Sequence, residues 1–113
     1  MPRDMRNDTS LGAMIGHVVQ RHARLSILRY LAAAPGYKLN SNILSDILDR
    51  DGMCLTFDSV ELLLEWLGAE LFLEISRGEN MVARLTDRGM DIAVGRGGHQ
   101  EIERPRPSAR PIW

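Results

Sequence analysis

Apolar residues recur at three- and four-residue steps in the first third of the chain, which predicts a helix. The pattern starts after Ser10, a possible cap, and consists of Leu11, Met14, Ile15, Val18, Leu25, Leu28 and Leu31. Gly12 and Gly16 lower the helix propensity of its first part. That part is therefore expected as a separate short helix or as an arm that packs on another subunit, whereas residues 21–34 form the stronger helix. Pro35 and Gly36 end it.

The clearest helical pattern covers residues 58–69. Its buried face is predicted to comprise Val60, Leu63, Leu64 and Leu67. Asp58, with Glu61 three residues later, has the spacing of a capping box, so Asp58 is the expected N-cap. A shorter helix should precede it, capped by Ser41 and stopped by Gly52. In the joint between the two helices, residues 53–55 are expected to fold back onto the core.

Two short apolar runs follow, at residues 71–76 and 81–85. The four residues between them include Gly78 and Asn80, which favour a turn, so the runs predict a β-hairpin. Residues 37–39 are expected to form a brief strand that pairs with this hairpin. Thr86 should open a last helix, and Gly95 should end it.

This order of elements is typical of a winged helix-turn-helix. We therefore predict a mostly α (α+β) domain with a short β-hairpin wing over residues 10–95. A flexible N-terminus, residues 1–9, should precede the domain, and a flexible, extended tail rich in Arg and Pro, residues 96–113, should follow it. Ile102, Ile112 and Trp113 are apolar enough to pack on a second subunit, and we expect a homodimer.

Composition narrows the cellular setting. The chain has 113 residues, 44% of them hydrophobic, which suits one domain with a core. Cys54 is the single cysteine, so no intramolecular disulfide forms, and a reducing cytosol is the expected compartment. No apolar run has the length of a bilayer span, and no membrane contact is expected.

Charge is distributed unevenly along the chain. The formal net charge is −1, yet residues 36–74 carry two basic and eight acidic side chains. The two flanks are basic. The helix-turn-helix is thus the acidic part of the protein, although DNA-binding helices usually present basic and amide side chains.

The chain resembles the winged-helix transcription factors of the ArsR type. The resemblance is carried by the helical run 59–67, by Glu70-Leu71-Phe72-Leu73, and by Leu85-Thr86-Asp87-Arg88-Gly89, which looks like the Leu-Thr-x-Arg/Lys-Gly signature found after the wing. Over residues 21–107 the pattern is similar to a small protein of Mu-like bacteriophages and prophages. That family is usually labelled an ArsR-family transcriptional regulator, which implies a function in binding double-stranded DNA.

The residues expected to contact DNA lie mainly at the wing. They are Arg77, Arg84 and Arg88, with Lys38 and Ser59 in support. Arginines at these positions can neutralise phosphates or enter the minor groove. An equally simple interpretation is a solvated surface of basic side chains.

The alternative function is protein–protein contact in phage assembly or DNA packaging. Leu62 and Trp66 lie four residues apart on the second helix, rotated from its buried stripe. If exposed, they form an apolar patch rimmed by Glu61, Glu65 and Glu70, and such a patch suits a protein partner. A wide helix face buried under the wing explains the same residues.

An enzyme, a cofactor site and a metal site are not expected. No nucleophile and base stand at a recognisable spacing, and no phosphate-binding loop follows a strand. Cys54 has no cysteine partner, and His17, His22 and His99 do not complete a metal site with it, so Cys54 is expected as a small buried or half-buried residue. The carboxylates at positions 46, 49, 51 and 58 do not have the spacing of a calcium loop.

Overall fold

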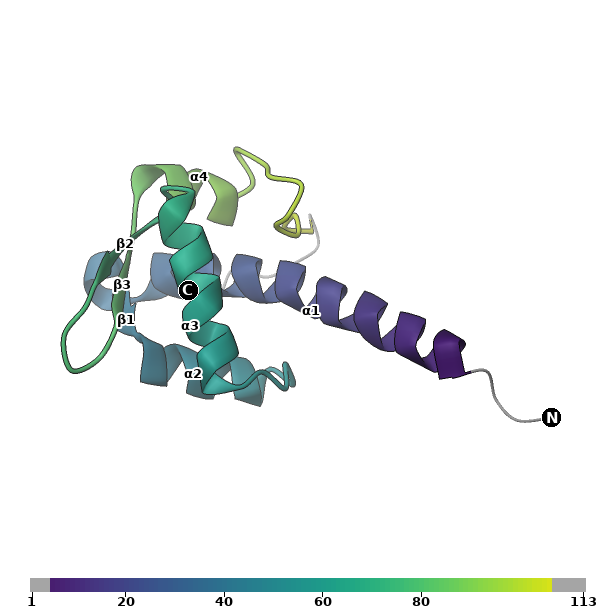
Figure 1. The fold of residues 1–113 in the computed structure, drawn as a ribbon. Coiled ribbons are helices and arrows are strands. Elements are labelled where there is room, and N and C mark those ends of the chain that lie inside the picture. Colours follow the sequence, from purple (N-terminus) through teal and green to yellow (C-terminus); the bar gives the residue numbers. More distant parts are fainter. Residues whose placement is uncertain (1–4, 107–113) are drawn as a thin grey trace.

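The computed structural model describes the backbone of residues 5–106 and the side chains of residues 10–106, and within this part the fold is α+β (Figure 1). Four α-helices lie to one side of a small antiparallel sheet (Figure 1). The elements are α1 (Met5–Ala33), a 3₁₀ turn (Pro35–Tyr37), β1 (Lys38–Asn40), α2 (Ser41–Arg50), α3 (Phe57–Ala69), β2 (Leu73–Ser76), β3 (Val82–Leu85) and α4 (Asp87–Ala93). Within this part, none of the helices has the length and apolarity needed to cross a membrane.

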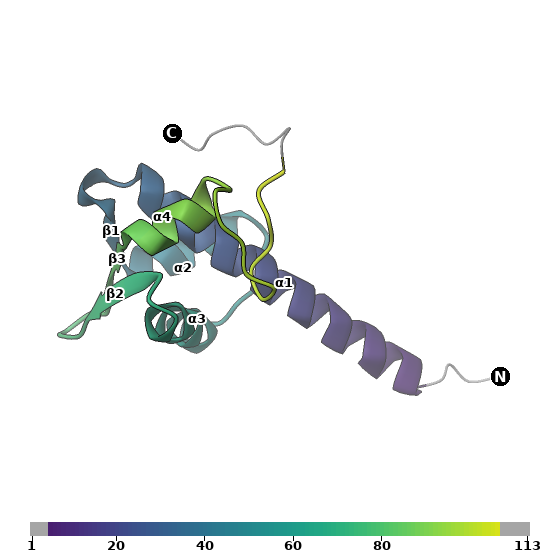
Figure 2. The same cartoon turned by 90° about the horizontal axis from the view of Figure 1, so that it is seen from above.

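The first helix is one continuous element, although the sequence was also compatible with a separate short helix before residue 21. It begins at Met5, five residues before the expected cap at Ser10. The glycines at 12 and 16 do not interrupt it, because neither proline nor a capping residue separates the two halves and the apolar periodicity continues through them. Its N-terminal half extends away from the fold, on the side opposite the hairpin (Figures 1 and 2).

The caps of α2 and α3 differ from those predicted. The Asn40 side chain accepts a hydrogen bond from the Ile43 amide at 2.8 Å, so Asn40 caps α2 and Ser41 becomes its buried first residue. The Thr56 hydroxyl accepts from the Ser59 amide at 3.1 Å and caps α3, which leaves Asp58 in the first turn. Both caps lie upstream of the predicted ones because each helix begins earlier than its apolar repeat indicates.

The sheet has the strand order β1-β3-β2. As predicted, β1 pairs with the hairpin, although it runs over residues 38–40, since Tyr37 has a positive φ and ends the 3₁₀ turn. Likewise β2 starts at Leu73, because Leu71 has a φ of 67° and cannot continue a strand. The Met81 carbonyl accepts from the Ser41 amide at 2.8 Å, which joins the end of the turn to the start of α2.

The core lies between the sheet and the helices. Its largest fully buried side chains come from α1, α2, α3, the link before β2 and the C-terminal segment, and they include Phe72, Ile27, Leu28, Leu31, Leu44, Leu48, Leu64, Leu67 and Ile102. The expected buried face of α3, formed by Val60, Leu63, Leu64 and Leu67, is confirmed. In the joint between α2 and α3, Met53 and Leu55 are partly buried against the core, whereas Cys54 between them is exposed, contrary to expectation.

The segment from Leu85 to Gly89 joins β3 and α4 to the link between α3 and β2. Thr86 caps α4 by accepting from the Gly89 amide at 3.0 Å, and its hydroxyl donates to the Leu71 carbonyl at 2.8 Å. A Cβ at position 89 would overlap the Phe72 carbonyl oxygen and lie 2.7 Å from Leu85 Cδ1. Glycine at this position is therefore required by the close approach of α4 to the Phe72 backbone.

The C-terminal segment, residues 96–106, folds back along α1. Ile102 is fully buried in the core of its own chain, where the sequence analysis expected contact with a second subunit. The Glu103 amide donates to the Arg21 carbonyl at 3.2 Å, and its carboxylate pairs with His22 at 3.1 Å and with Arg21 at 3.6 Å. The pKa of Glu103 is lowered, mainly by the hydrogen bond from the Arg104 amide and further by the nearby His22 and Arg21. Ile112 and Trp113 lie outside the described residues.

Replacing Gly89 by alanine is expected to destabilise the fold by about 1–3 kcal/mol, the usual cost of overpacking. The added methyl group must displace backbone at Phe72, although alanine is otherwise the better helix former. Urea unfolding measures the change. Gly78→Ala in the hairpin turn is the control, because a Cβ there has no neighbour within 4 Å. Equal stability of the two variants would contradict the close approach.

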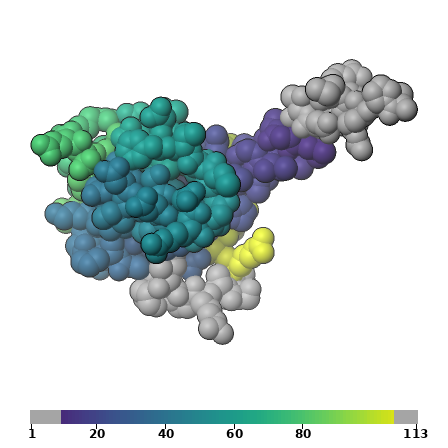
Figure 3. Space-filling view, turned by 90° about the horizontal axis from the view of Figure 1, so that it is seen from below, coloured from purple at the N-terminus to yellow at the C-terminus, as the bar shows by residue number. Residues whose placement is uncertain are grey.

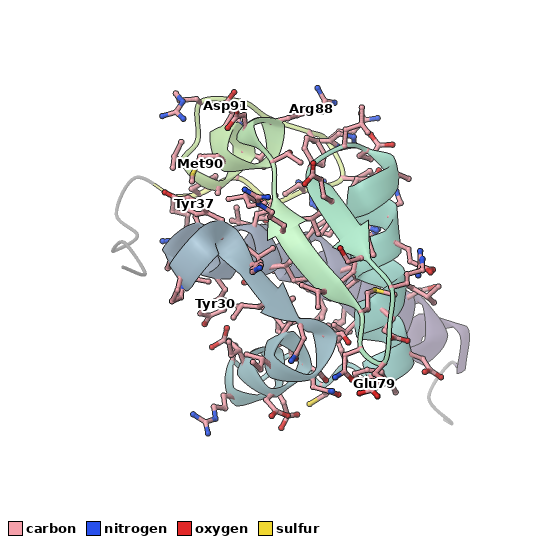
Figure 4. The ribbon with its side chains drawn as sticks, turned by 90° about the vertical axis from the view of Figure 1, so that its left-hand side faces the viewer. Tyr30, Tyr37, Glu79, Arg88, Met90 and Asp91 are labelled. Atoms are coloured by element: carbon pink, nitrogen blue, oxygen red, sulfur yellow. The ribbon has the colours of Figure 1, made fainter. Side chains whose placement is uncertain are left out.

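A hydrogen bond between Tyr30 and Asp51 joins α1 to the end of α2, as the position of Tyr30 beside these elements in Figure 4 indicates. The hydroxyl donates to the carboxylate at 2.7 Å. Burial first, and then this hydrogen bond, raises the pKa of Tyr30 from 10.0 to about 12. The folded state therefore holds the phenol proton more tightly than the unfolded chain does.

Stability should consequently decline as the pH rises from 10 towards 12, since the phenol ionises first in the unfolded chain. The contribution of Tyr30 is complete below pH 10 and is lost as its folded-state pKa is passed. Tyr30→Phe should show a smaller decline over this interval in urea unfolding midpoints. Identical declines in the two proteins would show that another group causes the alkaline loss.

Candidate contact surface

The exposed side of α3 carries acidic side chains around one apolar residue. Asp58, Leu62 and Glu65 are exposed and Glu61 is half-buried, and we call these four residues the α3 surface. Leu62 is 65% exposed. Helices α2 and α3 occupy the centre of the face seen in Figure 3. An apolar centre with a carboxylate rim suits a partner that offers both apolar and basic groups.

A shallow cleft separates the α3 surface from the hairpin turn. It is lined by Glu61, Glu65, Arg77, Gly78, Glu79 and Met81. Arg77 forms an ion pair with Glu65, with Nη1 and Oε2 3.1 Å apart. The positive charge of Arg77 is thus neutralised by Glu65 of α3. The lining of the cleft still contains more carboxylates than basic groups.

On the other side of Leu62, a groove lies between α1 and α3. Its lining consists of Gln20, Arg24, Leu55, Ser59, Leu62, Leu63 and Trp66. Trp66 is half-buried rather than fully exposed, since the Arg24 guanidinium lies 4.4 Å from its ring centroid and the His99 ring meets it edge-on at 5.2 Å. Leu62 therefore provides the exposed apolar part of this surface, and Trp66 contributes mainly to packing.

Sequence reasoning missed the buried Arg24. Its Nη1 donates to the Glu101 carbonyl at 2.8 Å, whereas its Nε is buried without a partner in the described part of the chain. Burial lowers the pKa of Arg24. The charge of Glu101 raises this pKa, and the charge of Arg21 lowers it further. No local pattern identifies this role, because Arg24 and Glu101 are 77 positions apart.

Two residues predicted to contact DNA, Arg88 and Ser59, form hydrogen bonds within the chain. Arg88 Nε donates to the Glu70 carbonyl at 3.0 Å, and its guanidinium lies 4.7 Å from the Phe72 ring centroid. The Ser59 hydroxyl accepts from Thr56 Oγ1 at 2.9 Å. Figure 4 places Arg88 on α4 and Glu79 at the hairpin turn, at opposite ends of the hairpin. Arg88 therefore does not join Arg77 in one basic surface.

Lys38 and Arg84 are brought together on the outer face of the sheet. They are register partners across β1 and β3, and both are exposed. Glu74 is the partner of Arg84 on β2, so the three side chains share this face. Among the described residues, neither Lys38 nor Arg84 forms an ion pair, which leaves two adjacent positive charges open to an anion.

The described residues contain no group of three or more histidine, cysteine or acidic side chains placed to hold a metal ion. His22 pairs with Glu103, and His99 pairs with Glu70 at 3.2 Å. These contacts connect the C-terminal segment with α1 and with the residue that follows α3.

No family model matches the chain. A solved structure of human N-acetylserotonin methyltransferase (ASMT) in complex with SAM aligns with 77% of this chain at a TM-score of 0.47 and 25% identity. This chain spans 23% of that protein, and a likeness at this level assigns neither fold nor activity.

The sequence itself has a clear relative. Over 97 residues it is 34% identical to uncharacterized protein gp26 of Escherichia phage Mu, a match that covers 85% of this chain and all of the relative. The chain therefore belongs to the family of the phage Mu protein gp26.

Proposed function

We propose that this member of the phage Mu gp26 family is a winged-helix module that binds a phage protein partner through its α3 surface. The element order and the strand order β1-β3-β2 support the winged-helix assignment. In that architecture α3 is the helix that would enter the DNA major groove. Here its exposed side presents Asp58, Glu61 and Glu65, which phosphates repel.

The observation that carries the proposal is the exposed Leu62 within this acidic rim. The ion pair between Arg77 and Glu65 strengthens the argument, because it compensates the one basic group of the neighbouring turn. A partner suited to this surface offers an apolar side chain flanked by Arg or Lys. Such a contact places a small apolar anchor at its centre and charge-assisted pairs at its rim.

Leu62→Lys should abolish partner binding and leave stability within about 0.5 kcal/mol, since Leu62 is exposed and lysine is a good helix former. Tagged wild type and variants would be used to recover bound proteins from cells in which the gene is natively expressed, with identification by mass spectrometry. Leu71→Lys is the matched control, because Leu71 is 68% exposed and lies outside the α3 surface. A partner retained equally by both variants would remove Leu62 from the interface.

Double-stranded DNA is the second candidate partner, and the open pair Lys38 and Arg84 favours it. The resemblance to ArsR-type regulators implies the same partner and a function in transcription regulation. In this mode the outer sheet face and the wing, rather than α3, would contact phosphates. Two adjacent positive charges are a modest basis for affinity compared with the six to ten phosphate contacts of typical regulators.

Binding of a fluorescent duplex of mixed sequence, measured at low and physiological salt, distinguishes the two candidates. The protein-contact proposal expects no binding at physiological salt. DNA contact instead predicts binding that declines steeply with salt. The slope of that decline should fall by about one for each phosphate that the Lys38→Ala, Arg84→Ala double variant no longer neutralises. Arg50→Ala, an exposed arginine on α2, serves as the control.

A further inference from the structure

Among the described residues, the groove between α1 and α3 is lined by one charged side chain, Arg24. The groove has a volume of about 250 Å³ and lies where α3 crosses α1 (Figure 1). Gln20 and Arg24, four residues apart on one helix face, form its α1 wall. Its α3 wall consists of Ser59, Leu62, Leu63 and Trp66. A largely apolar groove with one cation suits an apolar group that carries a negative charge.

The charge of Arg24 is incompletely compensated within the described part of the chain. Arg24 is only 9% exposed, and its Nε has no acceptor. The Glu101 carboxylate lies 3.9 Å from Nη1, beyond the roughly 2.7–2.9 Å of a charge-assisted hydrogen bond, and its side chain is 41% exposed. The Trp66 ring, 4.4 Å from the guanidinium, compensates part of the charge. Because buried charges are usually paired, a carboxylate from another molecule would complete this site.

We propose that the partner of the α3 surface places an apolar residue and a neighbouring acidic residue in this groove, where the carboxylate pairs with Arg24. The inference rests on the proposed function and adds a charge of the opposite sign to the partner. On the cleft side of Leu62 the charged rim is Glu61 and Glu65, whereas on the groove side the charged group is Arg24. The bound segment therefore changes from basic through apolar to acidic as it crosses α3.

This charge order distinguishes the segment from other occupants. A phosphate backbone pairs with Arg24 but is repelled by Glu61 and Glu65 on the other side of Leu62. A segment that is basic throughout satisfies the acidic rim and brings a like charge to Arg24. A small free acid fills the groove and leaves the acidic rim unpaired.

Titration of the full chain with capped peptides, followed in assigned amide NMR spectra, tests the proposal. The probe is acetyl-Lys-Leu-Leu-Glu-amide, and its two matched controls replace Glu by Gln or Lys by Gln. We expect a dissociation constant of about 1 mM, the order of a short flexible segment, with shifts at the residues that line the groove. The Glu-to-Gln peptide should bind about five- to tenfold more weakly, since it lacks the charge that pairs with Arg24.

Gln20→Glu and Gln20→Lys provide a charge-reversal pair on the α1 wall. Gln20 is exposed, and Glu and Lys are good helix formers, so both variants should fold. Gln20→Glu places an internal carboxylate beside Arg24 and should remove the preference for the Glu peptide over the Gln peptide, whereas Gln20→Lys should increase it. Arg24→Met should also remove the preference. Thermal unfolding checks that Arg24→Met folds, and the Gln20 pair decides the outcome if it does not.

Equal affinity of the Glu and Gln peptides for the wild type overturns the proposal, as does a preference that both Gln20 variants leave unchanged. Shifts centred on Lys38 and Arg84 overturn it too, since they reveal a general attraction of carboxylates to exposed cations. Acetyl-leucine that binds as tightly as the tetrapeptide identifies a free acid as the occupant and likewise overturns it.

The Lys-to-Gln peptide separates this proposal from the proposed function. If that peptide binds like the parent, the contact of a basic residue with Glu61 and Glu65 is contradicted. A preference for the Glu peptide in the same titration still supports the carboxylate site at Arg24.

Discussion

The contact between the start of α4 and the backbone at Phe72 is the constraint on which the arrangement of the other elements depends. Gly89 permits it, and the Thr86 hydroxyl completes it by bonding to the Leu71 carbonyl while capping α4. The link from α3 into β2 and the link from β3 into α4 are therefore joined at one point. The base of the hairpin is therefore attached beside the end of α3, and Arg77 at the hairpin turn lies within reach of Glu65.

This placement explains the charge of the candidate surface. With the hairpin held beside α3, Arg77 reaches Glu65, and Arg88 is bound to the Glu70 carbonyl. Basic side chains that would serve a DNA contact in a freer arrangement are thereby used within the chain. Lys38 and Arg84 remain open on the outer sheet face. Under the proposed function, a surface with these charges is better suited to a basic protein partner than to a phosphate backbone.

The sequence by itself determined the order and approximate extent of α2, α3, the hairpin and α4, because their signals are local. Apolar spacing, turn residues and the Thr86 cap each act within a few positions. It also identified the acidic character of α3, since charge is a property of residue type. The predicted caps, Ser41 and Asp58, lie one and two residues after the observed caps, Asn40 and Thr56. Several polar residues near each helix start are able to act as the cap, and only the path of the backbone selects one of them.

Only the tertiary structure decided which side chains are available for contact with a partner. Arg24 meets Glu101 across 77 positions, Arg88 meets Glu70 across 18, and Ile102 closes the core of its own chain. Nothing in the residue types distinguishes these engaged arginines from Lys38 and Arg84, because engagement depends on neighbours that are distant in the sequence. For the same reason the exposure of Leu62 and the partial burial of Trp66, four residues apart on one helix, followed from the packing of α1 and the C-terminal segment against α3.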